Sequence, residues 1–167
     1  MLCLLSLGTV LSAVTHAAIQ RPAVRLDVPV VKQPYNLCLA ASVSMVLKYW
    51  GIEITPEAIG AQVPVYQGGT TGDEMRRVVE QAGLQGFLIQ PLFEDLLQHL
   101  EKRRPVIVVL PAGPTGRHAV VLVGFDPSAE RVWVNDPAVG RQRALKYAEF
   151  RAQWDESRRW TFLIVPR

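Results

Sequence analysis

The strongest constraint on the fold of this 167-residue chain is a pair of β-rich runs separated by only five residues. Residues 118–125 and 131–135 are rich in Val, Leu and Trp, and the Asp-Pro-Ser-Ala-Glu between them is short enough for a hairpin connection. The two runs should therefore be antiparallel neighbours. His118 opens the first run and Asp136 follows the second, so a hairpin brings an imidazole and a carboxylate to one rim of a sheet.

Helical patterns dominate the first half of the chain and strand patterns the second. The sequence predicts helices over 38–50, 56–62, 73–82, 92–102 and 147–154, and further strands over 24–31, 86–90, 105–110 and 160–165. Helices followed by strands favour an α+β fold over a doubly wound α/β sheet. We expect an N-terminal helical part packed on a C-terminal antiparallel β-sheet.

Residues 1–18 form an apolar segment with no charged residue except the titratable His16. The segment is short for a membrane span and ends in small residues that suit cleavage, so it is interpreted as a signal peptide, although no Lys or Arg precedes it. An uncleaved anchor, an ordinary first helix or strand, or a misplaced start are the alternatives. The prediction is an exported protein, periplasmic or extracellular or held at the membrane by this segment, with one domain over 24–167.

Charge and composition argue against two classes of function. Lys and Arg outnumber Asp and Glu by 18 to 15, and the basic residues are scattered, so a nucleic-acid partner is not expected. The chain has no His-Glu-x-x-His motif and no paired-Cys spacing, and its three histidines are too few for a zinc site. Neither a metal nor another cofactor is predicted, and we expect a monomer.

Cys38 is the only cysteine outside the N-terminal segment, and it stands where the first helical pattern begins. Free backbone N–H groups and the helix dipole favour a thiolate at such a position, so Cys38 is a candidate nucleophile. An unpaired thiol in an oxidising compartment also needs a reason. The alternative is an inert cysteine that packs as a small apolar residue.

His118 and Asp136 are the groups that such a nucleophile requires. An aspartate that accepts a hydrogen bond from one ring nitrogen orients the histidine and leaves the other nitrogen for the thiolate. His99, by contrast, lies within a helical pattern and His16 within the N-terminal segment. The hairpin therefore makes His118 the candidate base.

These residues also resemble a known family. Gln33 lies five positions before Cys38, and His118-Ala-Val-Val-Leu-Val-Gly-Phe-Asp126 is followed by Val132-Trp-Val-Asn-Asp136-Pro-Ala-Val-Gly140. The pattern resembles the C39-type cysteine peptidases of the papain-like superfamily. The resemblance implies a papain-like fold in which Cys38 is the nucleophile, His118 the base and acid, and Asp136 the orienting group. It further implies that Gln33 stabilises the oxyanion of a tetrahedral intermediate.

Leu37 and Leu39 depart from this pattern, because the family usually has a polar residue before the nucleophile and glycine after it. They leave open a catalytically silent peptide-binding module of the same fold, and an acyl transferase using the same thiol is a further alternative to the peptidase. Family members fused to export transporters trim leader peptides after paired glycines, so a peptide or protein substrate and a transport or export system are the implied partners. Loops 64–72 and 111–117 should flank the histidine, and Leu39, Gly116 and Arg117 are the expected substrate contacts.

Overall fold

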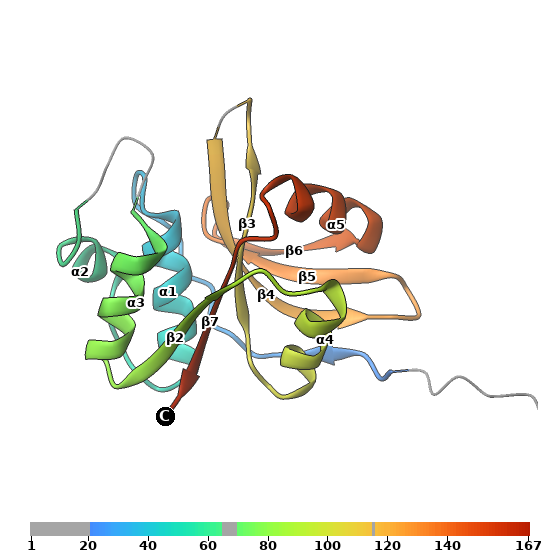
Figure 1. Ribbon diagram of the computed structural model, residues 1–167, viewed down its shortest axis with the longest axis horizontal. Coiled ribbons are helices and arrows are strands. Elements are labelled where there is room, and N and C mark those ends of the chain that lie inside the picture. Colours follow the sequence, from blue (N-terminus) through green and yellow to red (C-terminus); the bar gives the residue numbers. More distant parts are fainter. Residues whose placement is uncertain (1–20, 65–69, 115) are drawn as a thin grey trace, which may run out of the picture.

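The computed structural model describes residues 21–64, 70–114 and 116–167 (Figure 1). Its helices are α1 (Cys38–Tyr49), α2 (Pro56–Gly60), α3 (Gly72–Gln81), α4 (Phe93–Glu101) and α5 (Tyr147–Glu156). Its strands are β1 (Val24–Arg25), β2 (Leu84–Ile89), β3 (Val106–Ala112), β4 (Gly116–Asp126), β5 (Arg131–Asp136), β6 (Arg141–Lys146) and β7 (Thr161–Pro166). Among these described residues, no helix has the length and apolar character needed to cross a membrane.

The strands form one antiparallel sheet in the order β2-β7-β3-β4-β5-β6, with β1 added beside β4. In Figure 1, α1, α2 and α3 lie to one side of β2 and β7, whereas α4 and α5 lie to the other. This confirms the α+β architecture predicted from the sequence. The predicted segment 1–18 lies outside the described residues, as does 65–69 within the predicted 64–72 loop.

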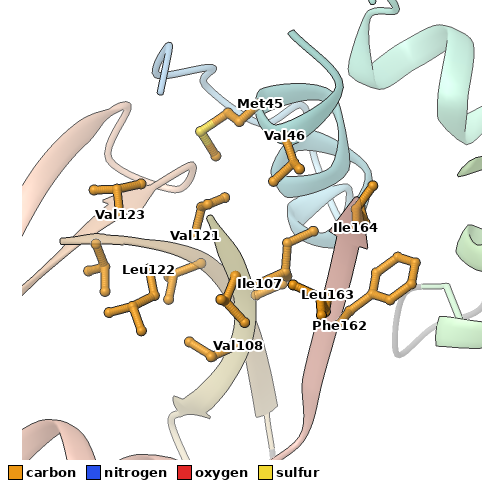
Figure 2. Close-up of a cluster of buried hydrophobic side chains, with 14 of the residues drawn as sticks. Met45, Val46, Ile107, Val108, Val121, Leu122, Val123, Phe162, Leu163 and Ile164 are labelled. Atoms are coloured by element: carbon orange, nitrogen blue, oxygen red, sulfur yellow. The ribbon is translucent and has the colours of Figure 1, made fainter. Parts of the chain in front are cut away.

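Helix α1 is the central buried element. Its residues from Leu39 to Leu47 are all buried, because the sequence is apolar or small on most of its faces. Met45 and Val46 face Val121 and Ile164 of the sheet (Figure 2). The helix ends where Gly51 adopts a φ of 82°, the left-handed conformation that glycine permits. The core packing of α1 thus fixes where its first residue, Cys38, stands relative to the sheet.

Strand β4 contains one extra residue opposite β5. Leu122 pairs with Val134, but the next pair is Gly124 with Trp133, so Val123 is bulged out of the ladder. The carbonyl oxygen of Val123 is not left unpaired, because the backbone N–H of Leu26 donates to it at 2.7 Å. The short pairing with β1 therefore stabilises the bulge.

The bulge decides which side of the sheet the predicted histidine and aspartate share. On the His118 side of the bulge the register pairs Val121 with Asn135, which brings Asp136 level with Val120. Side chains alternate along a strand, so His118 and Val120 point to the same side. Without the extra residue, Asp136 would be level with a β4 residue that points the other way. A one-residue shift of register is therefore what lets the two side chains meet.

Two strands differ from the sequence-based expectation. The predicted strand over 24–31 is reduced to Val24–Arg25, and Pro29, which has no N–H to donate, lies in the irregular chain that follows. Strand β6 was not predicted at all. Its sequence is mostly polar and only Leu145 is buried, as is usual for a strand at the edge of a sheet.

Candidate active site

Cys38 is the first residue of α1, and its thiol is partly buried rather than sealed in the core. The turn before it is held by a backbone hydrogen bond from Leu37 to the carbonyl of Pro34 at 3.2 Å. On the sheet side, the hydroxyl of Ser42 donates to the carbonyl of Ala119 at 3.2 Å and ties α1 to β4 one residue from His118. These contacts bring the helix N-terminus against the rim of the sheet.

His118 and Asp136 meet directly, as the hairpin predicts. The Nε2 atom of His118 lies 2.7 Å from Oδ1 of Asp136, and the Asp136 side chain is only 3% exposed. The backbone N–H of Ala138 donates to the same Oδ1 at 3.0 Å, which fixes the carboxylate within its turn. His118 also hydrogen bonds with Cys38, and since Nε2 is engaged by Asp136, Nδ1 is the nitrogen left for the thiol. The three residues predicted from the sequence are therefore linked in order, with His118 in contact with both Cys38 and Asp136.

Arg143 of β6 is a fourth member of this series that the sequence analysis missed. Its Nη1 donates to Oδ2 of Asp136 at 2.7 Å, so His118 and Arg143 each hold one carboxylate oxygen. Arg143 pairs across the sheet with Val134, which lies two residues from Asp136 on the same side of β5. Only a prediction of β6 and of its register could have identified Arg143 from the sequence.

The charges of the series depend on one another. Burial raises the pKa of the Cys38 thiol, but hydrogen bonds with His118 and the Ala119 backbone, and the charge on His118, outweigh this effect and lower the pKa below its ordinary value. Burial lowers the pKa of His118, but its bonds to Cys38 and Asp136 more than compensate, so that pKa is raised. These opposite shifts favour a thiolate beside an imidazolium.

Asp136 is held in its ionised form. Burial raises the pKa of its carboxyl group, but hydrogen bonds from His118 and Arg143 exceed that effect, so the pKa lies below its ordinary value. A carboxylate that stays ionised accepts the Nε2–H bond from His118 over a wide pH range. The buried aspartate thereby supports the charged form of the histidine.

Gln33 lies on the chain segment that borders the Asp136 turn. Its backbone N–H donates to the carbonyl of Pro137 at 2.9 Å, which anchors the segment leading to α1 against the end of β5. The side-chain Oε1 of Gln33 is buried and accepts no hydrogen bond from the described part of the chain. No other described residue thus fixes the amide group of Gln33. The backbone N–H of Cys38 is likewise in the first helical turn, where no intrahelical acceptor exists.

A pocket of about 290 Å³ opens beside the thiol. Cys38, Leu39 and Arg117 are among the residues that line it, together with Trp160 of the segment entering β7. Gly116 does not line it. Gly116 instead pairs with Ala112 at the close of the β3–β4 hairpin, where an added Cβ would collide with the Ala112 carbonyl. The predicted 111–117 loop is accordingly shorter than expected, since β3 and β4 extend to these two residues.

Leu37 and Leu39, the two departures from the family pattern, have different surroundings. The side chain of Leu37 packs against Gly60 of α2, where an added Cβ would lie 3.0 Å from a Leu37 methyl group. Leu39 is 8% exposed and lines the pocket beside the thiol. Leu37 is therefore accommodated by a glycine in a neighbouring helix, whereas Leu39 shapes the wall of the pocket.

The family of the chain follows from its sequence and fold together. The Peptidase_C39 like family matches residues 25–161, and the chain belongs to this family, whose members are generally cysteine peptidases. The matched region contains Cys38, His118 and Asp136. No curated protein matches the chain in sequence.

Solved structures share the fold. A protein described as a C39-like peptidase from Bacillus anthracis has a TM-score of 0.75 at 18% identity, over 88% of this chain and 99% of that one. The peptidase domain of Streptococcus ComA, a bi-functional ABC transporter involved in quorum sensing, has a TM-score of 0.70 at 17% identity, over 83% and 98%. A double glycine motif protease from an AMS/PCAT transporter, in complex with its leader peptide, has a TM-score of 0.66 at 24% identity, over 89% and 100%. The papain-like fold is thereby confirmed.

Proposed function

We propose that this protein is a cysteine peptidase that cleaves peptide bonds through an acyl-enzyme formed on Cys38. The observation that carries the proposal is the continuous contact from the thiol through His118 to a buried Asp136. The Cys38 thiolate attacks the carbonyl carbon of the substrate, and the carbonyl π electrons move onto the oxygen. The His118 imidazolium then gives its Nδ1 proton to the leaving amine as the carbon–nitrogen bond breaks.

Two donors are proposed to stabilise the oxyanion of the tetrahedral intermediate. The Nε2–H₂ group of Gln33 carries no competing hydrogen bond to another described residue, and the Cys38 backbone N–H has no intrahelical acceptor. One donor of this kind is worth about 3–4 kcal/mol of transition-state stabilisation. In the second half of the reaction, neutral His118 takes a proton from water, the resulting hydroxide oxygen attacks the thioester, and the acid product leaves Cys38.

We also propose that the protein acts after export, with residues 1–18 as its signal peptide or membrane anchor and the domain over 24–167 as the working unit. The support for this is the apolar N-terminal segment and the small residues that end it. A peptide or protein substrate and an association with an export system follow by analogy with the transporter peptidase domains that share the fold. We propose that the protein works as a monomer.

The test is turnover of a broad peptide panel by wild type and by Cys38→Ser, with intact-protein mass spectrometry of quenched reactions. The proposal predicts cleavage by wild type only, and a transient mass increase equal to the acyl half of the substrate. Peptide binding without cleavage by wild type would instead identify the silent binding module. Product that increases with added amine acceptors, at the expense of hydrolysis, would identify an acyl transferase.

A further inference from the structure

The pocket beside Cys38 has the size of a site for a bulky side chain. Its volume is about 290 Å³, and an apolar cavity of about 150 Å³ is enough to hold a benzene ring. A glycine at this position of a bound peptide would leave the pocket unfilled. An aliphatic or aromatic side chain would instead bury apolar surface there, at about 25 cal/mol per Å².

The larger part of the pocket wall is apolar, and Asn36, Thr70 and Thr71 add polar groups to it. Of the apolar residues, Leu39 comes from α1, Val109 from β3 and Ala119 from β4, and Trp160 precedes β7. The Trp160 ring packs against the N-terminus of α3 so closely that a Cβ on Gly72 would lie 2.8 Å from it. The Trp160 side of the pocket therefore cannot shift toward α3 without a clash.

The rim of the pocket carries one positive charge. Arg117 lines the pocket and is exposed, and no carboxylate of the described residues pairs with it. A free guanidinium beside an apolar pocket complements a ligand that presents a carboxylate next to an apolar group. Arg117 lines the same pocket as Cys38, so such a carboxylate would be held close to the thiol.

We infer that this pocket selects substrates with a large apolar residue, leucine-like or phenylalanine-like, flanked by an acidic residue, rather than paired glycines. Leu39 and Trp160 contact the apolar side chain, and Arg117 pairs with the carboxylate. The inference rests on the proposed peptidase function for its biological meaning, but the recognition itself is a binding property. It can therefore be measured with the nucleophile removed.

The experiment uses full-length Cys38→Ala protein and acetylated, amidated peptides of the form Ala-Xaa-Glu-Ala and Ala-Glu-Xaa-Ala, with Xaa as Gly, Leu or Phe. Kd is measured by calorimetry and by the fluorescence change of the tryptophans. The Leu and Phe peptides should bind at least about tenfold more tightly than the Gly peptides. Replacing Glu by Lys in the peptide should weaken binding a few-fold, and more at low salt than at high salt.

Two protein variants separate the roles of pocket and rim. Arg117→Glu should reverse the Glu-over-Lys preference, while Arg131→Glu, an exposed arginine on the β4–β5 hairpin, should leave it unchanged. Val109→Phe should fill the pocket and abolish the preference for Leu and Phe over Gly. Circular dichroism checks that Arg117→Glu and Val109→Phe are folded. If either is unstable, the peptide series on the Cys38→Ala protein alone decides whether the pocket prefers Leu and Phe over Gly.

Equal Kd values for the Gly, Leu and Phe peptides, including no measurable binding of any, would overturn the inference, as would an unchanged Glu-over-Lys ratio in Arg117→Glu. Failure of the peptidase proposal gives a different result. In that case the Leu, Phe and Glu preferences are present in Cys38→Ala, but wild type cleaves none of the peptides.

Discussion

The Nε2 atom of His118 lies 2.7 Å from Oδ1 of Asp136. This contact determines the chemistry of the site because it assigns the two ring nitrogens. Nε2 is committed to the aspartate, so Nδ1 is the atom that exchanges a proton with Cys38. The aspartate is in turn held by Arg143 and by the Ala138 backbone. Each of these contacts leads to a prediction.

Asp136→Asn should destabilise the protein in a pH-dependent manner. The pKa of the Asp136 carboxyl group is lowered in the folded state, and its unfolded value is about 3.9. The ionised carboxylate therefore contributes stability that is complete above about pH 4 and is lost as the pH falls through the folded pKa. Urea unfolding at pH 6 should show a loss of about 2 kcal/mol, and the difference from wild type should shrink at pH 3.

Asp155→Asn is the matched control for this experiment. Asp155 is 62% exposed and its ion pair with Arg159 is 3.9 Å long, so its removal should change the free energy of unfolding very little at either pH. Equal losses for Asp136→Asn at both pH values would show that the carboxylate charge does not contribute to stability.

Arg143→Gln should lower activity without disrupting the fold. Arg143 holds Oδ2 of Asp136 at 2.7 Å but is 44% exposed, so the effect on kcat/KM should be about fivefold, equivalent to ~1 kcal/mol. Arg143→Lys should recover part of the loss. The acidic limb of the pH–rate profile should also move, because the hydrogen bond from Arg143 helps to hold the pKa of the Asp136 carboxyl group below its ordinary value. Arg77→Gln, an exposed arginine on α3, should leave both kcat/KM and the pH profile unchanged.

Gln33→Ala should lower kcat by about 100-fold and change KM much less, since the oxyanion exists only in the transition state and the intermediate. Stopped-flow and steady-state kinetics on one substrate would separate the two constants. Gln62→Ala is the matched control, because the Gln62 side chain caps only the Ala58 carbonyl of α2. A KM effect that equals the kcat effect would argue against the oxyanion role of Gln33.

Gly124→Ala should damage both stability and the site. A Cβ at residue 124 would lie 2.5 Å from the carbonyl oxygen of Val24, so β1 has to move away from the bulge. The expected loss is about 1–3 kcal/mol, together with slower alkylation of Cys38 as the β4–β5 register loosens. Gly83→Ala should cost about 1 kcal/mol through its left-handed backbone alone, because its φ is 87° and no described residue lies within 4 Å of an added Cβ. Its alkylation rate should match wild type.

Most of the fold could be predicted from the sequence because helix and strand patterns are segregated along the chain. The N-cap Thr55 and the glycines after α1 and α3 identified the helix boundaries to within a few residues. Strand β6 was missed because an edge strand needs no apolar alternation. The chain after β1 was overpredicted because β-branched residues favour extended backbone whether or not a partner strand is present.

The hairpin predicts that His118 and Asp136 lie at the same rim of the sheet. It does not by itself predict that their side chains point to the same side of the sheet. Simple counting back from the pair of Asp126 with Arg131 would have placed the two side chains on opposite sides, and the Val123 bulge corrects this. Gly124, which follows the bulged Val123 inside an apolar run, is the local signal that could have indicated a bulge. The sequence does not show that Leu26 reaches the Val123 carbonyl from another part of the chain. Arg143 was hidden for a similar reason, since its partner lies on a different strand.

The pH dependence of Cys38 alkylation by iodoacetamide tests the central claim, an ion pair between Cys38 and His118, most directly. Because the pKa of the thiol is lowered and that of His118 is raised, fast alkylation of wild type should persist well below the ordinary thiol pKa of about 8.5. The same measurement on His118→Ala should move the profile toward that of urea-denatured protein. A wild-type profile that coincides with the denatured control across the whole pH range would contradict the account.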